Sequence, residues 1–259
     1  MDVREHNRKV WNRNVEQKNR WTVPVSRETV ENARKGQWEI VLTPIKPVPR
    51  EWFPDLMDME VLCLASGGGQ QGPVLAAAGA HVTVLDYSPR QLAQDRLVAE
   101  RDSLEIKTVE GDMANLSMFP DQSFDLIFHP VSNCFVPNVR PVWKESFRVL
   151  KKGGLLLAGF VNPVVYLFDY KLAAQQNILQ AKYKLPYADT LDLSALEKAK
   201  FLEEGWEFEF GHTLEDQIGG QLEAGFLIAG FYEDIHPEGE NDLLSKYTPT
   251  FIATKALKP

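Results

Sequence analysis

The residues with the clearest chemical meaning are the glycines of residues 61–86, VLCLASGGGQQGPVLAAAGAHVTVLD. A G-x-G-x-x-G pattern at 67–72 follows an apolar run, and Asp86 stands about 20 residues beyond that run. Such glycines let the backbone turn sharply between a strand and a helix and leave room for a ligand. An acidic residue at the end of the next strand accepts hydrogen bonds from ribose hydroxyls. The stretch therefore predicts a site for a ribose-containing cofactor.

Two cofactor classes fit this pattern, a nicotinamide dinucleotide and S-adenosylmethionine, and three further features favour the second. About sixty residues with structural patterning precede the first expected strand, whereas a dinucleotide-binding fold usually begins there. Gly111-Asp112-Met113 follows the third expected strand, where a side chain and a backbone N–H can contact an adenine edge. The last two expected strands form an antiparallel pair, which is foreign to the Rossmann strand order.

The elements that must position these residues alternate from residue 60 onward. The expected elements are, in chain order, strand 61–65, helix 70–79, strand 81–86, helix 89–101, strand 106–112, strand 124–129, helix 137–151 and strand 155–161. This alternation is typical of a doubly wound α/β fold with a mostly parallel sheet. In such folds, ligands bind at the carboxyl ends of the strands.

Both ends of the chain depart from the alternation. Residues 3–19 and the stretch after Ser26 predict two helices, and the proline-rich segment 43–54 predicts an ordered linker. After helix 213–224, strands 226–234 and 249–257 are joined across a polar loop with Pro237 and Gly239. Because no helical crossover joins them, we expect these two strands to be antiparallel. The expected organisation is a helical cap with linker at 1–57, a cofactor-binding core at 58–162, an insertion at 163–212 and a completing segment at 213–259.

Polar residues at two strand ends are candidates for the reaction itself. His129 ends the fourth expected strand, where it could act as a general base, contact the cofactor or simply pack in the core. His212, before the late helix, is a second candidate base, and its structural alternative is a bond to a nearby carboxylate. Four further polar residues could position an acceptor, or could serve only as structural hydrogen-bonding groups: Ser132, Asn133, Asn162 and Tyr166.

Five motifs in order resemble the class I S-adenosylmethionine-dependent methyltransferases, in particular the small-molecule enzymes similar to those of ubiquinone biosynthesis. The motifs are VLCLASGGG, VTVLDYS, EGDMANLSMFPDQSFDLIF, ESFRVLKKGGLLLAGF and LEAGFLIAGFYED. The resemblance covers about residues 58–161 closely and 212–257 more loosely. It implies a Rossmann-like, mostly parallel seven-stranded sheet with an antiparallel terminal strand, and S-adenosyl-L-methionine as the cofactor.

The resemblance also implies roles for particular residues. It implies that Ala65, Gly67 and Gly69 line the methionine half of the cofactor and that Asp86 binds the ribose. It implies that Tyr87, Asp112 and Met113 surround the adenine. Gln70 and His129 are expected to contact the cofactor, and His212 is expected to face the acceptor. Two positions depart from the family pattern. Cys63 replaces the usual acidic residue, which removes a carboxylate that often helps to hold the methionine ammonium, and Ala65 replaces the first glycine.

Composition limits the class of protein and its partners. The 259 residues carry a net charge of −8, which argues against nucleic acid as the main partner, although residues 1–50 carry a net +5. We expect a cytoplasmic enzyme, because no apolar run reaches about 18 residues and the charged N-terminal stretch lacks the pattern of a secretory signal. Cys63 and Cys134 are expected to be reduced thiols, and no metal-ligand spacing is present.

The sequence thus predicts transfer of a methyl group from S-adenosylmethionine to a small-molecule acceptor by SN2 displacement. Such a displacement needs an aligned acceptor, exclusion of water and, for some acceptors, a base. Three alternatives remain open at this stage. They are a methyltransferase acting on tRNA or protein, a cofactor-binding module without activity, and an NAD(P)-dependent oxidoreductase.

Overall fold

The computed structural model describes residues 2–237 and 242–259, and a seven-stranded sheet forms its centre. The strand order is β3-β2-β1-β4-β5-β9-β8. The strands are β1 (Glu60–Leu64), β2 (His81–Asp86), β3 (Ile106–Glu110), β4 (Phe124–His129), β5 (Leu150–Val161), β8 (Leu227–Asp234) and β9 (Phe251–Leu257). The first five are parallel to one another, and β9 is antiparallel to both of its neighbours. The predicted sheet with one antiparallel terminal strand is confirmed; Gly239, in the loop before β9, lies outside the described residues.

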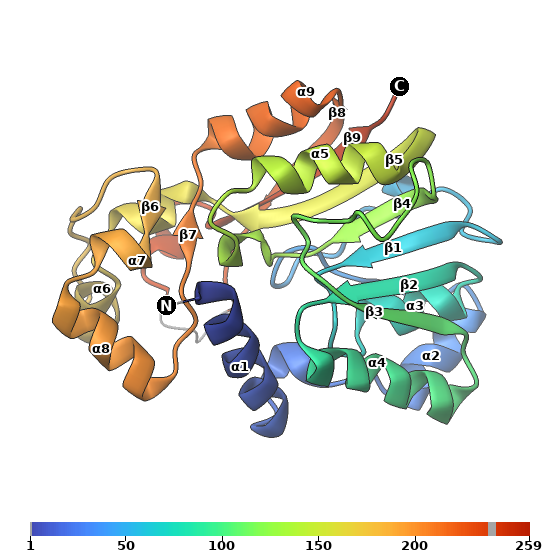
Figure 1. Ribbon diagram of the computed structural model, residues 1–259, viewed down its shortest axis with the longest axis horizontal. Coiled ribbons are helices and arrows are strands. Elements are labelled where there is room, and N and C mark those ends of the chain that lie inside the picture. Colours follow the sequence, from blue (N-terminus) through green and yellow to red (C-terminus); the bar gives the residue numbers. More distant parts are fainter. Residues whose placement is uncertain (1, 238–241) are drawn as a thin grey trace.

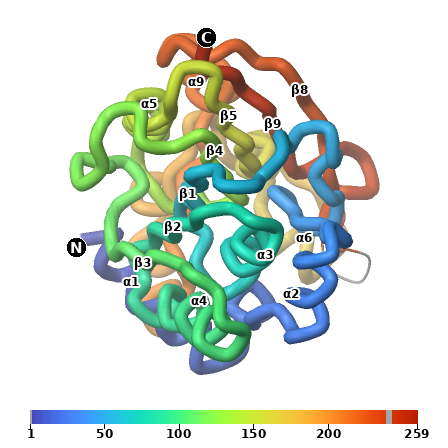
Figure 2. Tube along the Cα trace, turned by 90° about the vertical axis from the view of Figure 1, so that its right-hand side faces the viewer, coloured from blue at the N-terminus to red at the C-terminus, as the bar shows by residue number. Residues whose placement is uncertain are grey.

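Helices cover both faces of this sheet (Figures 1 and 2). The helices α2 (Arg27–Arg34), α3 (Gln71–Ala77) and α4 (Pro89–Asp102) lie on one face, and α5 (Arg140–Val149) and α9 (Gly220–Ala224) lie on the other. Because helices cover both faces, the central strands carry apolar side chains on both sides. In β1, Val61 and Cys63 pack toward the first group of helices, while Leu62 and Leu64 pack toward the second.

The clearest differences from the expected boundaries lie at the start of β5 and in the late helix. Helix α5 ends at Val149, and β5 begins at Leu150, so Gly153 and Gly154 lie inside the strand and do not end the helix as expected. The register of β5 against β4 shifts between Phe124 and Leu126, and Gly153 has a φ of 80° that suits glycine. The glycine pair therefore shapes an irregular stretch of strand. The expected late helix 213–224 is likewise divided, into a π-helical turn at Glu215–Gly219 followed by α9.

The N-terminal segment runs across the carboxyl ends of the strands. It contains α1 (Val3–Glu16), a 3-10 turn at Arg20–Thr22, α2, and a second 3-10 turn at Arg50–Trp52. The linker between α2 and the second 3-10 turn is attached to the sheet by Asp234 of β8. This carboxylate accepts hydrogen bonds from the backbone N–H groups of Ile45 (3.0 Å) and Lys46 (2.9 Å). The linker also crosses directly over β5, where a Cβ on Gly159 would lie 2.3 Å from the carbonyl oxygen of Leu42.

The insertion between β5 and β8 forms a lobe beside the sheet, at the left of Figure 1. Its elements are a 3-10 turn at Pro163–Leu167, α6 (Tyr170–Gln176), β6 (Tyr187–Ala188), α7 (Asp189–Asp192), α8 (Ala195–Glu204) and β7 (Phe210–Gly211). Helix α1 joins this lobe to the core. The buried amide of Asn7 donates to the carbonyl of Phe208 (2.9 Å) and accepts from its N–H (2.9 Å).

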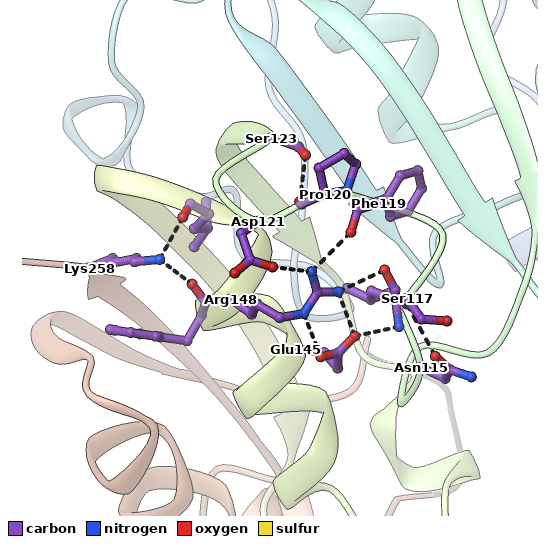
Figure 3. A network of polar contacts seen from close by, with 12 residues as sticks. Asn115, Ser117, Phe119, Pro120, Asp121, Ser123, Glu145, Arg148 and Lys258 are labelled. Carbon is purple, nitrogen blue, oxygen red and sulfur yellow. Dashed lines mark hydrogen bonds and ion pairs between the residues drawn. The ribbon is translucent and has the colours of Figure 1, made fainter.

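A guanidinium network holds the long loop between β3 and β4 (Figure 3). Arg148 of α5 donates to both oxygens of Glu145 at 2.8 Å, and to the loop carbonyls of Leu116 (2.8 Å) and Phe119 (2.9 Å). Glu145 in turn accepts from the N–H of Leu116 at 2.8 Å. This loop begins with Asp112 and Met113, so the network stabilises the backbone that carries two predicted cofactor residues.

Among residues 2–237 and 242–259, no helix has the length and apolar character needed to cross a membrane.

Candidate functional site

A cavity of about 550 Å³ lies at the carboxyl ends of the parallel strands. The loops after β1, β2, β3 and β4 form one side of it, and α1 and the linker at 41–44 form another. One face of α1 contributes Arg4, Asn7, Arg8 and Trp11, which are spaced as neighbours on a helix. The volume is within the range of about 300–1,000 Å³ that is usual for small-molecule sites.

The glycine loop and Asp86 lie together in the cavity wall. Asp86 accepts a hydrogen bond from the N–H of Gly67 (3.0 Å) on one carboxylate oxygen and from the N–H of Ser88 (2.8 Å) on the other. Burial raises the pKa of Asp86 to about 6, against the lowering effect of these backbone donors. A side chain at position 67 would meet both Gln91 (2.7 Å) and Asp86 (3.0 Å), so only glycine permits this approach. Both oxygens keep further acceptor capacity toward the cavity.

A buried carboxylate lies beneath the glycine loop although Cys63 has replaced the acidic residue of the family pattern. Asp95 of α4 is fully buried, and one of its oxygens accepts from the N–H of Gly68 at 3.0 Å. Its other oxygen has no hydrogen-bond partner among the residues that the structure describes. Burial raises the pKa of Asp95 to about 8, and the carboxylate helps to raise the pKa of the Cys63 thiol. Asp95 is not among the predicted site residues, because nothing in the sequence pattern of α4 indicates a contact with the loop after β1.

The expected adenine region is contacted by the N-terminal helix. Tyr87, Asp112 and Met113 all line the cavity. Asp112 forms an ion pair with Arg4 of α1 (2.6 Å), and its other oxygen accepts from the N–H of Ala114 (2.9 Å). Part of the acceptor capacity of Asp112 is therefore taken by α1 in this structure.

The cavity brings together eight of the predicted site residues, namely Ala65, Gly67, Gln70, Asp86, Tyr87, Asp112, Met113 and Ser132. Five others, Gly69, His129, Asn133, Asn162 and His212, are outside its lining, as is the ring of Tyr166. Gly69 has a φ of 71° and faces α4, where a Cβ would lie 2.9 Å from the carbonyl oxygen of Gln94. Asn162 caps the turn at 163–167 and donates to the carbonyl of Pro249 at 3.0 Å.

The two candidate bases are both buried and hydrogen-bonded to backbone. His129 donates from Nδ1 to the carbonyl of Leu64 (2.8 Å), and burial lowers its pKa to about 4. Its Nε2 has no hydrogen-bond partner in the described part of the chain. His212 donates from Nε2 to the carbonyl of Asn133 at 3.2 Å, and burial lowers its pKa as well. The catalytic role predicted for each histidine stays a prediction, and neither ring is part of the cavity lining.

Two carboxylates that sequence analysis did not select line the cavity, Glu207 and Glu209. The hydroxyl of Tyr166 donates to Glu209 at 2.7 Å, so this predicted substrate residue reaches the site through a neighbour. The alternation in WEFEF (206–210) is the signal that could have found them, because alternate residues of an extended segment share one side.

The strand order, the glycine loop and the acidic end of β2 together define a class I S-adenosylmethionine-dependent methyltransferase fold. The sequence model described as a methyltransferase domain matches residues 62–158. The chain is 56% identical over 253 residues to a protein of Bacillus subtilis named "Uncharacterized methyltransferase YbaJ", covering 98% of this chain and 97% of that one. It belongs to the S-adenosylmethionine-dependent methyltransferases.

Two more distant similarities agree with this family. A demethylmenaquinone methyltransferase of Tropheryma whipplei is 29% identical over 164 residues, which are 62% of this chain and 66% of that protein. The crystal structure of an S-adenosylmethionine-dependent methyltransferase from Mesorhizobium loti superposes with a TM-score of 0.62 at 19% identity, covering 80% of this chain and 94% of that one. The protein is therefore an enzyme whose cofactor is S-adenosylmethionine, and the dinucleotide alternative is excluded.

The residues present fit this cofactor. The crowded glycine loop leaves its ligand-facing side free of side chains, and Asp86 offers acceptor atoms suited to ribose hydroxyls. Tyr87 and Met113 offer flat or apolar surface beside them. Bound S-adenosylmethionine supplies a methyl group on a positively charged sulfur, which makes that carbon electrophilic.

Proposed function

We propose that this methyltransferase acts on a small-molecule acceptor that binds in the same cavity as the cofactor. The observation that carries the proposal is the part of the cavity wall that is formed by elements outside the parallel strands and their loops. Helix α1, the linker at 41–44 and the segment at 207–209 all belong to this wall. The cavity of about 550 Å³ that they help to form has the size of a small-molecule site, which favours a small acceptor over a macromolecule.

The chemistry assigned to the wall is orientation and exclusion of water. Apolar side chains that line the cavity beyond the glycine loop include Trp11, Val41, Leu42, Phe135, Val136, Val161, Val165 and Phe251. Such side chains bury the body of an acceptor and keep water from the electrophilic carbon. Ser132 is a polar neighbour among them and donates to the carbonyl of Pro130 at 2.9 Å.

The charges of α1 argue against a nucleic-acid acceptor. Arg4 pairs with Asp112, and Arg8 pairs with Glu5 (2.8 Å) and Glu110 (3.4 Å). Two arginines of the basic N-terminal stretch are thus matched to acidic groups of this chain near the cavity. Phosphate binding depends on unneutralised Lys and Arg, and these two arginines are already neutralised.

Transfer of a labelled methyl group tests the proposal. Purified protein with S-[methyl-³H]adenosylmethionine is incubated separately with a deproteinised metabolite extract, with bulk tRNA and with a desalted protein extract. We expect label in the fraction of small molecules only. Label that accumulates in tRNA or protein, with none in the metabolite extract, would contradict a small-molecule acceptor.

A further inference from the structure

Glu207 and Glu209 face the cavity because of the backbone between α8 and β7. The intervening Phe208 is fully buried on the opposite side, in a cluster with Leu193 and Phe201. Its backbone is fixed by both hydrogen bonds with Asn7. In an extended segment, residues on either side of a buried one share the other side. Two carboxylates are therefore held in the cavity wall.

Each carboxylate is oriented by a neutral donor on one oxygen. Asn14 of α1 donates to Oε1 of Glu207 at 2.6 Å, and Tyr166 donates to Oε2 of Glu209 at 2.7 Å. The second oxygen of each carboxylate, Oε2 of Glu207 and Oε1 of Glu209, has no hydrogen-bond partner within the described ranges 2–237 and 242–259. These oxygens remain available to a ligand.

Within residues 2–237 and 242–259, no Lys or Arg neutralises this pair. Among the described residues, neither carboxylate forms an ion pair with Lys or Arg, and the lining arginines Arg4 and Arg8 pair elsewhere. The groups around Glu209 are themselves acidic or neutral: Tyr166, Cys134, Asp189 and Glu207. Burial raises the pKa of Glu209 to about 7, with further contributions from Asp189 and Glu207. Burial also lowers the pKa of His236, another lining residue, which disfavours its charged form.

We infer that the acceptor is a small cationic amine with an apolar body, and that Glu207 and Glu209 bind its ammonium group. The inference rests on the proposed small-molecule function. Two half-buried carboxylates without a cation are unfavourable, and an ammonium group supplies both the charge and the hydrogen-bond donors that their free oxygens lack. The apolar side chains nearby, such as Val165 and Phe251, suit the rest of such a molecule. An anionic acceptor would be repelled.

Calorimetry on the full-length protein saturated with S-adenosylhomocysteine tests the inference. Phenethylamine and tryptamine are compared with 2-phenylethanol, 3-phenylpropionate and 3-indolepropionate, which keep the ring and change the charged group. We expect at least one amine to bind ten-fold or more tightly than the alcohol, and the propionates to bind undetectably. Each of the variants Glu207→Gln and Glu209→Gln should weaken binding of the amine ten-fold or more. Binding of S-adenosylhomocysteine should weaken less than two-fold.

Glu203→Gln is the matched control, because Glu203 is exposed on α8 in the same lobe. It should leave amine binding unchanged. Retained binding of S-adenosylhomocysteine shows that each variant is folded. The inference is overturned if no amine binds, if amine and alcohol bind equally, or if the Gln variants keep the amine preference.

A second measurement separates the acceptor from the cofactor. If the two carboxylates instead stabilise the positively charged sulfur of the cofactor, the Gln variants will weaken the binding of S-adenosylmethionine far more than that of S-adenosylhomocysteine. Binding of the amine will then be unchanged. That result would overturn the inference while leaving the proposed function intact. Label transfer to tRNA or protein, in contrast, would remove the proposed function itself.

Discussion

The carboxylate of Asp86 is shared between the glycine loop and the cavity. Its two backbone bonds hold it in place, and its remaining acceptor capacity points to a ligand with hydroxyl donors. Because burial raises its pKa to about 6, the carboxyl is ionised above that pH and loses its charge below it. The strongest hydrogen bonds to ribose should therefore form above pH 6.

Asp86→Asn should weaken binding of S-adenosylhomocysteine ten-fold or more, since a charge-assisted hydrogen bond contributes about 1.5–3 kcal/mol. Titration calorimetry at pH 5 and pH 7.5 gives the second part of the expectation. The natural protein should bind more weakly at pH 5, and the variant should lose this difference. Asp58→Asn, at an exposed turn, serves as the control. Equal affinity of Asp86→Asn and the natural protein would show that the ribose is bound elsewhere.

Titration of Asp95, beneath the glycine loop, should make the unfolding free energy of the protein depend on pH. The folded pKa of Asp95, about 8, lies above its unfolded value of about 3.9, so its contribution to stability is complete below pH 4 and is lost as the pH rises to 8. We expect Asp95→Asn to reduce the loss of unfolding free energy between pH 5 and pH 9 by about 1 kcal/mol or more. Urea denaturation at pH 5 and at pH 9 measures this difference in unfolding free energy. A variant with the same pH dependence as the natural protein would mean that Asp95 stays ionised.

At the scale of elements, the linker is part of the cavity because β5 has a glycine where they cross. Gly159→Ala would place a methyl group against the carbonyl oxygen of Leu42, a residue of the cavity wall. Backbone must move, so we expect a loss of about 1–3 kcal/mol in unfolding free energy together with weaker binding of S-adenosylhomocysteine.

Gly219→Ala is a matched control for that prediction. Gly219 has helical dihedral angles, and the nearest atom to an added Cβ is 3.6 Å away. The control should be neutral or slightly stabilising, because alanine favours helix over glycine. Chemical denaturation compares the two variants. Similar effects of both substitutions would argue that the crossing over β5 does not constrain the linker.

At the scale of the whole molecule, α1 is the element that connects the insertion to the core. It reaches the insertion through Asn7 and Asn14, and the loops of the core through Arg4 and Arg8. Removal of the Asn7 amide would leave the buried N–H and carbonyl of Phe208 without partners. Those two backbone groups hold the segment that presents Glu207 and Glu209.

Asn7→Ala should therefore lower the unfolding free energy by about 2 kcal/mol or more, since each unsatisfied buried group costs about 1–3 kcal/mol. Lys9→Ala, on the exposed face of the same helix, should change it by less than about 0.5 kcal/mol. Urea denaturation and calorimetry with S-adenosylhomocysteine measure both. If Asn7→Ala were as stable as Lys9→Ala, the insertion would not depend on α1.

The sequence by itself determined the order of the elements, the glycine loop and the position of Asp86. These follow from local patterns: the apolar runs of buried strands, the glycines at a sharp turn, and an acidic residue one strand further on. The antiparallel pairing of β8 and β9 is expected as well, because the sequence pattern predicts no helical crossover between these two strands.

Only the tertiary structure decided which side chains meet in the cavity. β4 is a central strand that is covered on both faces, so its apolar pattern does not indicate on which side of the sheet His129 lies. In the structure, the His129 ring is buried against Trp143. Alternation in 206–210 places Glu207 and Glu209 on one side, yet that side becomes a cavity wall only when α1 packs against Phe208. The contact of Arg4 with Asp112 joins residues 108 positions apart. Contacts of this kind depend on how elements pack in space, which no local pattern of residues encodes.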